Sequence, residues 1–152
     1  MHICIFEDRE LENLQPLVHF KPVYDLMCGM TTLRQKIVRL FSNASVTLHV
    51  RSYLAGVLRR DCGDCLVNEI PSHAGEVLFI NGRVLADPSF PDRVKYDGTD
   101  SVYSRDGVAV AAWLSGKNLE NVGDLLQSRV LSLSDFSGLE ERNLEVPLVT
   151  YP

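Results

Sequence analysis

The feature that most constrains this chain is its opening run, Ile3–Phe6. The run is short and apolar, contains β-branched isoleucines, and is followed directly by Glu7 and Asp8. A run of this kind is typical of a buried strand, and charged residues at its end indicate a polar site. In open α/β sheets, ligands bind beyond the carboxyl ends of the strands. We therefore expect Glu7, Asp8 and the loop after them to border a ligand site.

Strand-like and helix-like segments alternate through the first half of the chain. Thr31 or Thr32 opens an amphipathic helix, and Ser45–Val50 predicts a second strand. A further helix is expected over 51–60 with Ser52 as its cap, and Glu76–Ile80 predicts a strand closed by Asn81-Gly82. This alternation predicts an α/β fold with a mostly parallel sheet and helices on its faces.

The second half adds an antiparallel element. Ser101–Ser104 and Val108–Leu114 are strand-like and are joined across Asp106-Gly107, a strong hairpin signal, so we expect a mixed sheet. Asn118–Arg129 has the apolar spacing of a helix, whereas 139–148 shows no clear period.

Composition sets the outer limits. The chain has 152 residues, the length of about one domain, and a formal charge of −5, which argues against a nucleic-acid partner. No apolar run is long enough to span a membrane, and we expect a cytoplasmic protein. All four cysteines are then expected to be reduced. Cys62 and Cys65 have metal or redox spacing, but zinc would need two further ligands, such as Cys28 with His73 or His49.

An ordered series of motifs in the first half resembles a known family. The chain is similar to the sugar nucleotidyltransferases, most closely to a divergent bacterial branch assigned to glucose-1-phosphate or N-acetylglucosamine-1-phosphate nucleotidyltransferases. The residues that carry the resemblance are Phe6-Glu7-Asp8, Asn13-Leu14, Pro16-Leu17, Lys21-Pro22-Val23, Gly29, Thr32-Leu33, Lys36 and Asn81-Gly82-Arg83. The resemblance implies a Rossmann-like three-layer fold, truncated here to the N-terminal part, residues 1–152. We expect the left-handed β-helix that ends members of that branch to be absent, since no hexapeptide repeats are present.

The resemblance also implies a reaction, in which a nucleoside triphosphate and a sugar 1-phosphate give a nucleotide sugar and pyrophosphate, with Mg²⁺ as cofactor. It implies Lys21 and Arg83 as catalytic residues. The implied phosphate-binding set is Asp8, Arg9, Asn13, Lys21, Asn81, Gly82 and Arg83. Two parts depart from the usual pattern, because the loop after Phe6 has no glycine and Arg83 stands where relatives carry the Mg²⁺-binding aspartate. A guanidinium does not ligate a cation, so Asp8, or Asp87 further on, is the remaining candidate metal ligand.

Other interpretations stay open at this point. The domain is either an enzyme of nucleotide-sugar or cell-envelope synthesis or a non-catalytic scaffold that binds a nucleotide or sugar phosphate, as a monomer or an oligomer. A flavodoxin-like regulatory domain with Asp8 in an acidic pocket would require a regular five-stranded parallel order. Structurally, Lys21 can be a solvated lysine, Asp8 can cap the following turn, and Glu7 can pair with Arg83 or Lys21.

Overall fold

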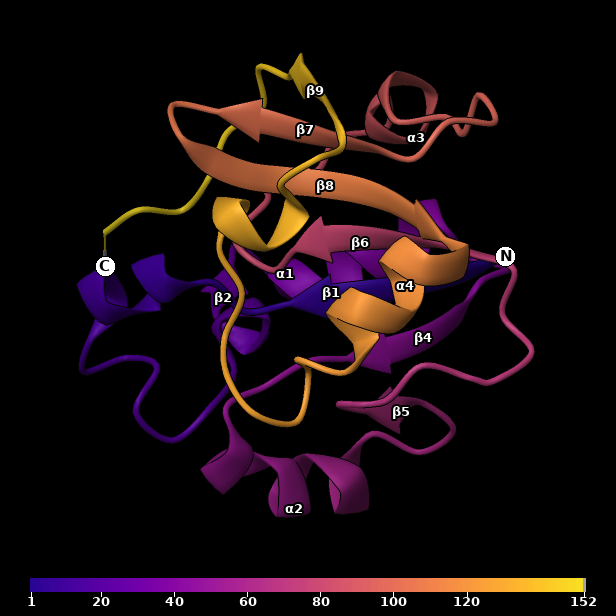
Figure 1. Ribbon diagram of the computed structural model, residues 1–152. Coiled ribbons are helices and arrows are strands. Elements are labelled where there is room, and N and C mark those ends of the chain that lie inside the picture. Colours follow the sequence, from indigo (N-terminus) through magenta and orange to yellow (C-terminus); the bar gives the residue numbers. More distant parts are fainter. Residues whose placement is uncertain (152) are drawn as a thin grey trace.

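The protein is built around one mixed seven-stranded sheet, seen in a computed structural model that describes residues 1–151 (Figure 1). The strand order is β5-β4-β1-β6-β8-β7-β9. The bounds of these strands are β1 His2–Phe6, β4 Ser45–Leu48, β5 Leu66–Val67, β6 Glu76–Asn81, β7 Ser101–Arg105, β8 Val108–Ser115 and β9 Glu140–Asn143. A separate short hairpin joins β2 Met27–Cys28 to β3 Thr31–Thr32.

The first strand is central, as its continuous apolar run predicts. All five residues of β1 are buried, and β1 pairs in parallel with both β4 and β6. Phe6 lies opposite Asn81 in the register, so the residues that follow β1 and β6 leave the sheet side by side. The ends of β1 and β6 are therefore adjacent.

Helices cover both faces of the sheet. One face carries Ile3, Ile5 and Ile80 against α1 (Leu33–Leu40) and α2 (Ser52–Asp61), and the other carries Phe6 and Phe79 against α4 (Gly116–Gly123). The remaining helical elements are η1 Arg9–Leu14, η2 Val23–Asp25, α3 Phe90–Arg93 and η3 Leu133–Phe136. Layers of this kind on a mostly parallel sheet confirm the predicted α/β class.

Local sequence signals predict some helix ends correctly and others wrongly. Thr32 caps α1 through a capping box with Gln35, as its position before the apolar stripe predicts. The predicted cap at Ser52 is wrong, because α2 begins at Ser52 and its N-cap residue is Arg51, whose side chain turns to Glu7. The helix expected over 118–129 ends early at Gly123, where the chain turns instead of completing further regular turns.

The hairpin forms as predicted, with Asp106 at φ 50° and Gly107 at φ 78°, the left-handed pair that a tight two-residue connection needs. Strand β8 runs antiparallel to β6, which overturns the regular parallel order of the flavodoxin-like alternative. Strand β9, not foreseen from the sequence, pairs in parallel with β7 and closes that edge. Its polar residues, mostly exposed at a sheet edge, carry no alternating pattern.

The expectation of four reduced cysteines is wrong for one pair. Cys62 and Cys65 form a disulfide across the turn that follows α2, while Cys4 and Cys28 are free thiols. A disulfide occupies both sulfurs, so this pair does not serve as two metal ligands. Among the described residues, no helix combines the length and apolarity needed to cross a membrane.

Candidate functional site

The candidate site lies where β1, β4 and β6 end at the same edge of the sheet. Because these strands are parallel, the segments that follow them, Glu7–Asp8, His49–Arg51 and Gly82–Arg83, emerge together. This is the edge at which open α/β sheets bind ligands.

Asp8 and Arg83 form a buried, two-pronged ion pair at this edge. Arg83 Nε donates to Asp8 Oδ1 at 3.0 Å, and Arg83 Nη2 donates to Asp8 Oδ2 at 2.7 Å. Asn81 Nδ2 donates to the same Oδ2 at 2.8 Å and to the carbonyl of Ala109 at 2.9 Å. The exposed fractions are 4% for Asp8 and 1% for Arg83, so the pair is shielded from water. A bidentate guanidinium–carboxylate contact is among the strongest polar contacts in proteins.

The same arginine holds the end of the described chain. Arg83 Nη1 donates to the carbonyl of Val149 at 3.0 Å, and the amide of Val149 donates back to the carbonyl of Arg83 at 2.9 Å. Leu85 is also tied to this segment, since its amide donates to the carbonyl of Pro147. Arg83 therefore joins β1, β6 and the C-terminal segment at one point.

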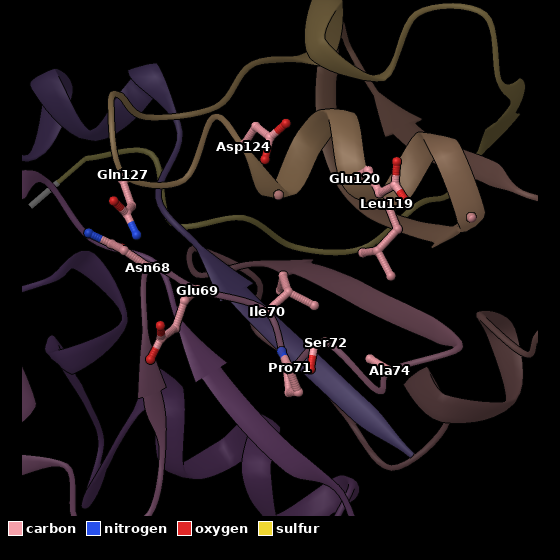
Figure 2. Close-up of a pocket in the computed structure, with 12 residues that line it drawn as sticks. Asn68, Glu69, Ile70, Pro71, Ser72, Ala74, Leu119, Glu120, Asp124 and Gln127 are labelled. Atoms are coloured by element: carbon pink, nitrogen blue, oxygen red, sulfur yellow. The ribbon is translucent and has the colours of Figure 1, made fainter.

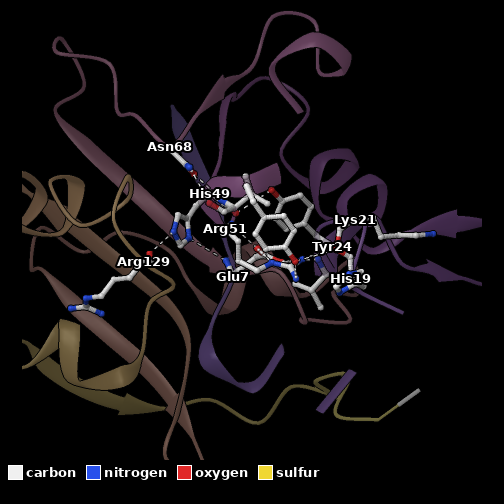
Figure 3. A network of polar contacts seen from close by, with 11 residues as sticks. Glu7, His19, Lys21, Tyr24, His49, Arg51, Asn68 and Arg129 are labelled. Atoms are coloured by element: carbon white, nitrogen blue, oxygen red, sulfur yellow. Dashed lines mark hydrogen bonds and ion pairs between the residues drawn. The ribbon is translucent and has the colours of Figure 1, made fainter. Parts of the chain in front are cut away.

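Glu7 makes a second buried pair, with Arg51 after β4 (Figure 3). Arg51 Nε and Nη2 lie 3.1 and 3.2 Å from Oε1 and Oε2 of Glu7, which also accepts from the amides of Arg51 and Val23. Burial raises the pKa of the Glu7 carboxyl, and the Arg51 guanidinium with these amides opposes that rise. Glu7 thus pairs with a basic residue as expected, but the partners suggested from the sequence, Arg83 and Lys21, are wrong.

This second pair fixes the loop that carries Lys21. Arg51 Nη2 donates to the carbonyl of Lys21 at 2.8 Å, and Tyr53, bonded to Arg51 Nη1, donates its hydroxyl to the carbonyl of His19 at 3.1 Å. The side chain of Lys21 is exposed and points away from the Glu7–Arg51 contact (Figure 3). The backbone of this loop is therefore held, and its lysine is left accessible.

His49 is a buried neutral histidine in the same network. Its Nδ1 accepts from the amide of Glu7 at 3.3 Å, so Nε2 carries the proton and donates to the carbonyl of Arg129 at 2.9 Å. Burial lowers the pKa of His49 to about 4, from an ordinary value of 6.5.

We expect the free energy of unfolding to fall as the pH decreases from about 6.5 to about 4. The folded state takes up the His49 proton only near pH 4, whereas the unfolded chain takes it up near 6.5, so acid favours unfolding. A shift of this size corresponds to about 3 kcal/mol. The measurement is urea unfolding at several pH values for the wild type and His49→Gln.

The His49→Gln protein should lose a smaller part of its stability between neutral pH and pH 4 than the wild type does. His2, whose pKa burial also lowers to about 4, contributes equally to both proteins and cancels in the comparison. The exposed His19→Gln is the matched control and should follow the wild-type profile. Identical pH profiles for the wild type and His49→Gln would contradict the neutral, buried assignment.

The other predicted site residues lie in different settings. Arg9 is exposed and lines two cavities at the edge of the sheet, while the Asn13 amide donates to Glu10 Oε2 at 2.9 Å on the surface. At Gly82 an added Cβ would lie 2.7 Å from Tyr24 Cδ1 and 3.2 Å from the carbonyl of Phe6, so glycine is needed there for packing. The structure thus brings Asp8, Asn81, Gly82 and Arg83 together and leaves Arg9, Asn13 and Lys21 accessible on the loops around them.

One cleft opens at Arg9, and another lies beside α4. One, of about 360 Å³, is lined by Arg9, Leu11, Glu12, Arg51 and Val130 and lies beyond the ends of β1 and β4. The other, of about 510 Å³, runs between α4 and the segment that connects β5 to β6 (Figure 2). Three carboxylates, Glu69, Glu120 and Asp124, line the second cleft, so the first is the better setting for an anionic ligand.

The arrangement around Asp8 does not fit a magnesium ion. Both of its carboxylate oxygens already accept from Arg83, and a cation on them would face the guanidinium at close range. Asp87, the alternative ligand, is exposed and accepts from the amide and hydroxyl of Ser89. Across residues 1–151, no three His, Cys, Asp or Glu side chains converge as a metal site.

Sequence reasoning missed Arg51 and His49, the residues that hold Glu7. The available signal was their position directly after the second predicted strand, at the same edge as Glu7. Polar residues at the ends of two neighbouring parallel strands meet at that edge, so they belong to one candidate site.

Residues 3–152 match the family described as sugar nucleotidyl transferase. The chain belongs to this family. The match covers nearly the whole chain and confirms the resemblance seen in the first strand and its loop. No curated protein matches the chain in sequence.

Solved structures support the fold of this sugar nucleotidyl transferase family member. The inositol-1-phosphate CTP transferase of T. maritima aligns with a TM-score of 0.58 at 10% identity, over 100% of this chain and 90% of that one. Molybdopterin-guanine dinucleotide biosynthesis protein A of Archaeoglobus fulgidus gives 0.57 at 9%, over 95% and 83%. A protein of Bacillus anthracis assigned as a glucose-1-phosphate thymidylyltransferase and solved with sucrose gives 0.53 at 10%, over 95% and 87%.

Proposed function

We propose that the carboxyl edge of the sheet binds a nucleoside triphosphate and a sugar 1-phosphate and catalyses nucleotidyl transfer between them. The observation that carries this proposal is the cleft of about 360 Å³ beyond β1 and β4, which has Arg9 and Arg51 in its lining. Membership of the sugar nucleotidyl transferase family supports the reaction class. Guanidinium groups that follow the ends of parallel strands suit a phosphorylated ligand.

The reaction asks for positioning and charge neutralisation more than for covalent chemistry. A phosphate oxygen of the sugar 1-phosphate attacks the α-phosphorus in line, the bond to the β-phosphate oxygen breaks, and pyrophosphate leaves with the electron pair. In our proposal Arg9 and Lys21 contact the phosphates as they bind, and Asn13 lies on the same loop. Arg51, whose charge is paired with Glu7, donates to the Lys21 carbonyl and so fixes the backbone of the loop that carries Lys21.

The buried cluster has a structural role in this proposal. Asp8, Asn81, Gly82 and Arg83 hold the ends of β1 and β6 together beneath the loops. A direct phosphate contact by Arg83 would require Asp8 to release the guanidinium, so we assign Arg83 a positioning role in the proposed reaction.

A second candidate is a non-catalytic domain that binds a nucleotide or a sugar phosphate. Two observations favour it: the loop after β1 lacks glycine, and Asp8 is engaged by Arg83. A glycine-free loop brings its backbone amides less closely around a triphosphate.

Calorimetry and a pyrophosphate assay separate the two candidates. UTP, dTTP and N-acetylglucosamine 1-phosphate are titrated into the protein with and without Mg²⁺, and pyrophosphate release is followed in mixtures. Binding with release of pyrophosphate supports the transferase. Binding without release leaves the scaffold, and absence of binding to all three ligands contradicts both candidates.

Replacing Arg9 should weaken nucleotide binding. Arg9→Gln removes an exposed charge that lines the proposed cleft, and loss of one charge-assisted contact corresponds to about tenfold in affinity. The matched control is Arg39→Gln, an exposed arginine in the last turn of α1, which should bind like the wild type. Equal affinities for the two variants would place the phosphates elsewhere. The measurement is the dissociation constant by calorimetry.

A further inference from the structure

Asp8, at the edge of the sheet where the proposed ligand binds, is already paired with the full positive charge of Arg83. The guanidinium of Arg83 donates to both carboxylate oxygens, at 3.0 and 2.7 Å, and Asn81 Nδ2 donates a further hydrogen bond to Oδ2. A carboxylate bound in this way has its charge balanced within the protein, and each of its oxygens already accepts from the guanidinium.

We infer that Arg83 is a built-in cation, which takes the position of a protein-bound divalent metal and keeps Asp8 from binding one. The proposed function supplies the location of the ligand in this inference, whereas the exclusion of metal rests on the Asp8–Arg83–Asn81 contacts alone. Charge on the phosphates is then balanced by arginines and lysine, together with any metal that the nucleotide itself brings.

The contacts of the arginine argue that it stays in place. Its third nitrogen, Nη1, donates to the carbonyl of Val149, and its own amide donates to Asn81 Oδ1 at 2.9 Å. Its exposed fraction is 1%. Moving the guanidinium aside for a metal would cost the buried Asp8 carboxylate both of its arginine contacts and would leave the Val149 carbonyl without this donor. Each of these losses is unfavourable.

The nearest polar side chains are already engaged. Glu10, which lines the small cavity beside Asp8, accepts from Asn13. Asn81 uses its side-chain oxygen for the amide of Arg83 and its nitrogen for Asp8 and the Ala109 carbonyl. The neighbouring carboxylate, Glu7, is fully buried and engaged by Arg51 and by the amide of Val23. Magnesium needs at least one free carboxylate oxygen and several waters. Both oxygens of Asp8 are engaged by Arg83, and the cavity that Asp8 lines is only about 40 Å³.

Mn²⁺ binding to the ligand-free protein tests the inference directly. The enhancement of water proton relaxation by Mn²⁺ is titrated for the wild type and for Asp8→Asn. We expect the two proteins to show the same weak, non-specific binding. A wild-type site that Asp8→Asn weakens by about tenfold or more, the loss typical of a damaged metal site, would overturn the inference.

Two further measurements keep the inference testable if Asp8→Asn does not fold. Crystals of the wild type soaked in Mn²⁺ should show no anomalous peak beside Asp8, and a peak at about 2.1 Å from its carboxylate would overturn the inference. In Arg83→Gln the carboxylate loses its cation, so a folded variant should bind Mn²⁺ at least about tenfold more tightly than the wild type. Unchanged Mn²⁺ affinity in folded Arg83→Gln would also count against Arg83 as the excluding group.

These measurements contain no nucleotide and no sugar phosphate. Failure of the ligands to bind in calorimetry would contradict the proposed function but would not affect the inference that Asp8 binds no metal. A metal site at Asp8 would contradict the inference about Arg83, and the proposed transfer reaction would still be tested separately.

Discussion

Arg83→Met should lower the free energy of unfolding by about 3–5 kcal/mol, the loss expected when one partner of a buried ion pair is removed. The variant leaves the carboxylate of Asp8 buried, with Asn81 as its remaining side-chain donor. It also releases the carbonyl of Val149, so the C-terminal segment loses one of its ties to β6. Urea unfolding at pH 7, followed by circular dichroism, measures the change.

The double variant Asp8→Asn with Arg83→Met is the informative comparison. It has no unpaired charge, so it should recover part of the stability lost in Arg83→Met. Arg142→Met is the matched surface control, because Arg142, on the edge strand β9, pairs with the exposed carboxylates of Asp97 and Glu140. Exposed pairs contribute little, and we expect almost no change for that variant. A loss in Arg83→Met no larger than in Arg142→Met would contradict a buried, engaged pair.

Much of the fold follows from short-range patterns in the sequence. The Ile3–Phe6 and Glu76–Ile80 runs identify central strands because a strand buried on both faces is apolar throughout. Asp106-Gly107 identifies the hairpin because few residues other than glycine and aspartate or asparagine accept its left-handed geometry. Strand β9 is an exposed edge with no such pattern, and its pairing depends on β7, almost forty positions earlier.

The sequence indicates where the site lies better than it indicates which acidic and basic side chains pair there. Adjacent parallel strands bring Asp8 and Arg83 to one edge, which the order of the strands indicates. Which acid pairs with which base is decided by packing: Arg51 follows β4 and faces Glu7, while Arg83 follows β6 and faces Asp8. Asp8 and Arg83 form a closed pair with each other, and the accessible charge lies on the surrounding loops.

Glu7→Ala should have an effect of similar size and should also release the loop that carries Lys21. The Glu7 carboxylate accepts from the amides of Val23 and Arg51 and from the Arg51 guanidinium, all at 3.0–3.2 Å. Removing it leaves a largely buried guanidinium and two amides without acceptors, so we expect the free energy of unfolding to fall by about 3–5 kcal/mol. Glu120→Ala, which breaks an exposed pair with Lys117, is the control and should change stability little.

Hydrogen exchange distinguishes a local effect on the loop from a general loss of stability. In Glu7→Ala the amide of Val23 should exchange faster than the amides of β6, because its acceptor is gone while the pairing of β6 with β8 is intact. If Lys21 contacts phosphate, nucleotide affinity should fall in the same variant, since the backbone that positions the lysine is no longer held by Arg51. Equal acceleration at Val23 and across β6 would show that Glu7 acts on the whole domain, and the link from Glu7 through Arg51 to Lys21 would then be wrong.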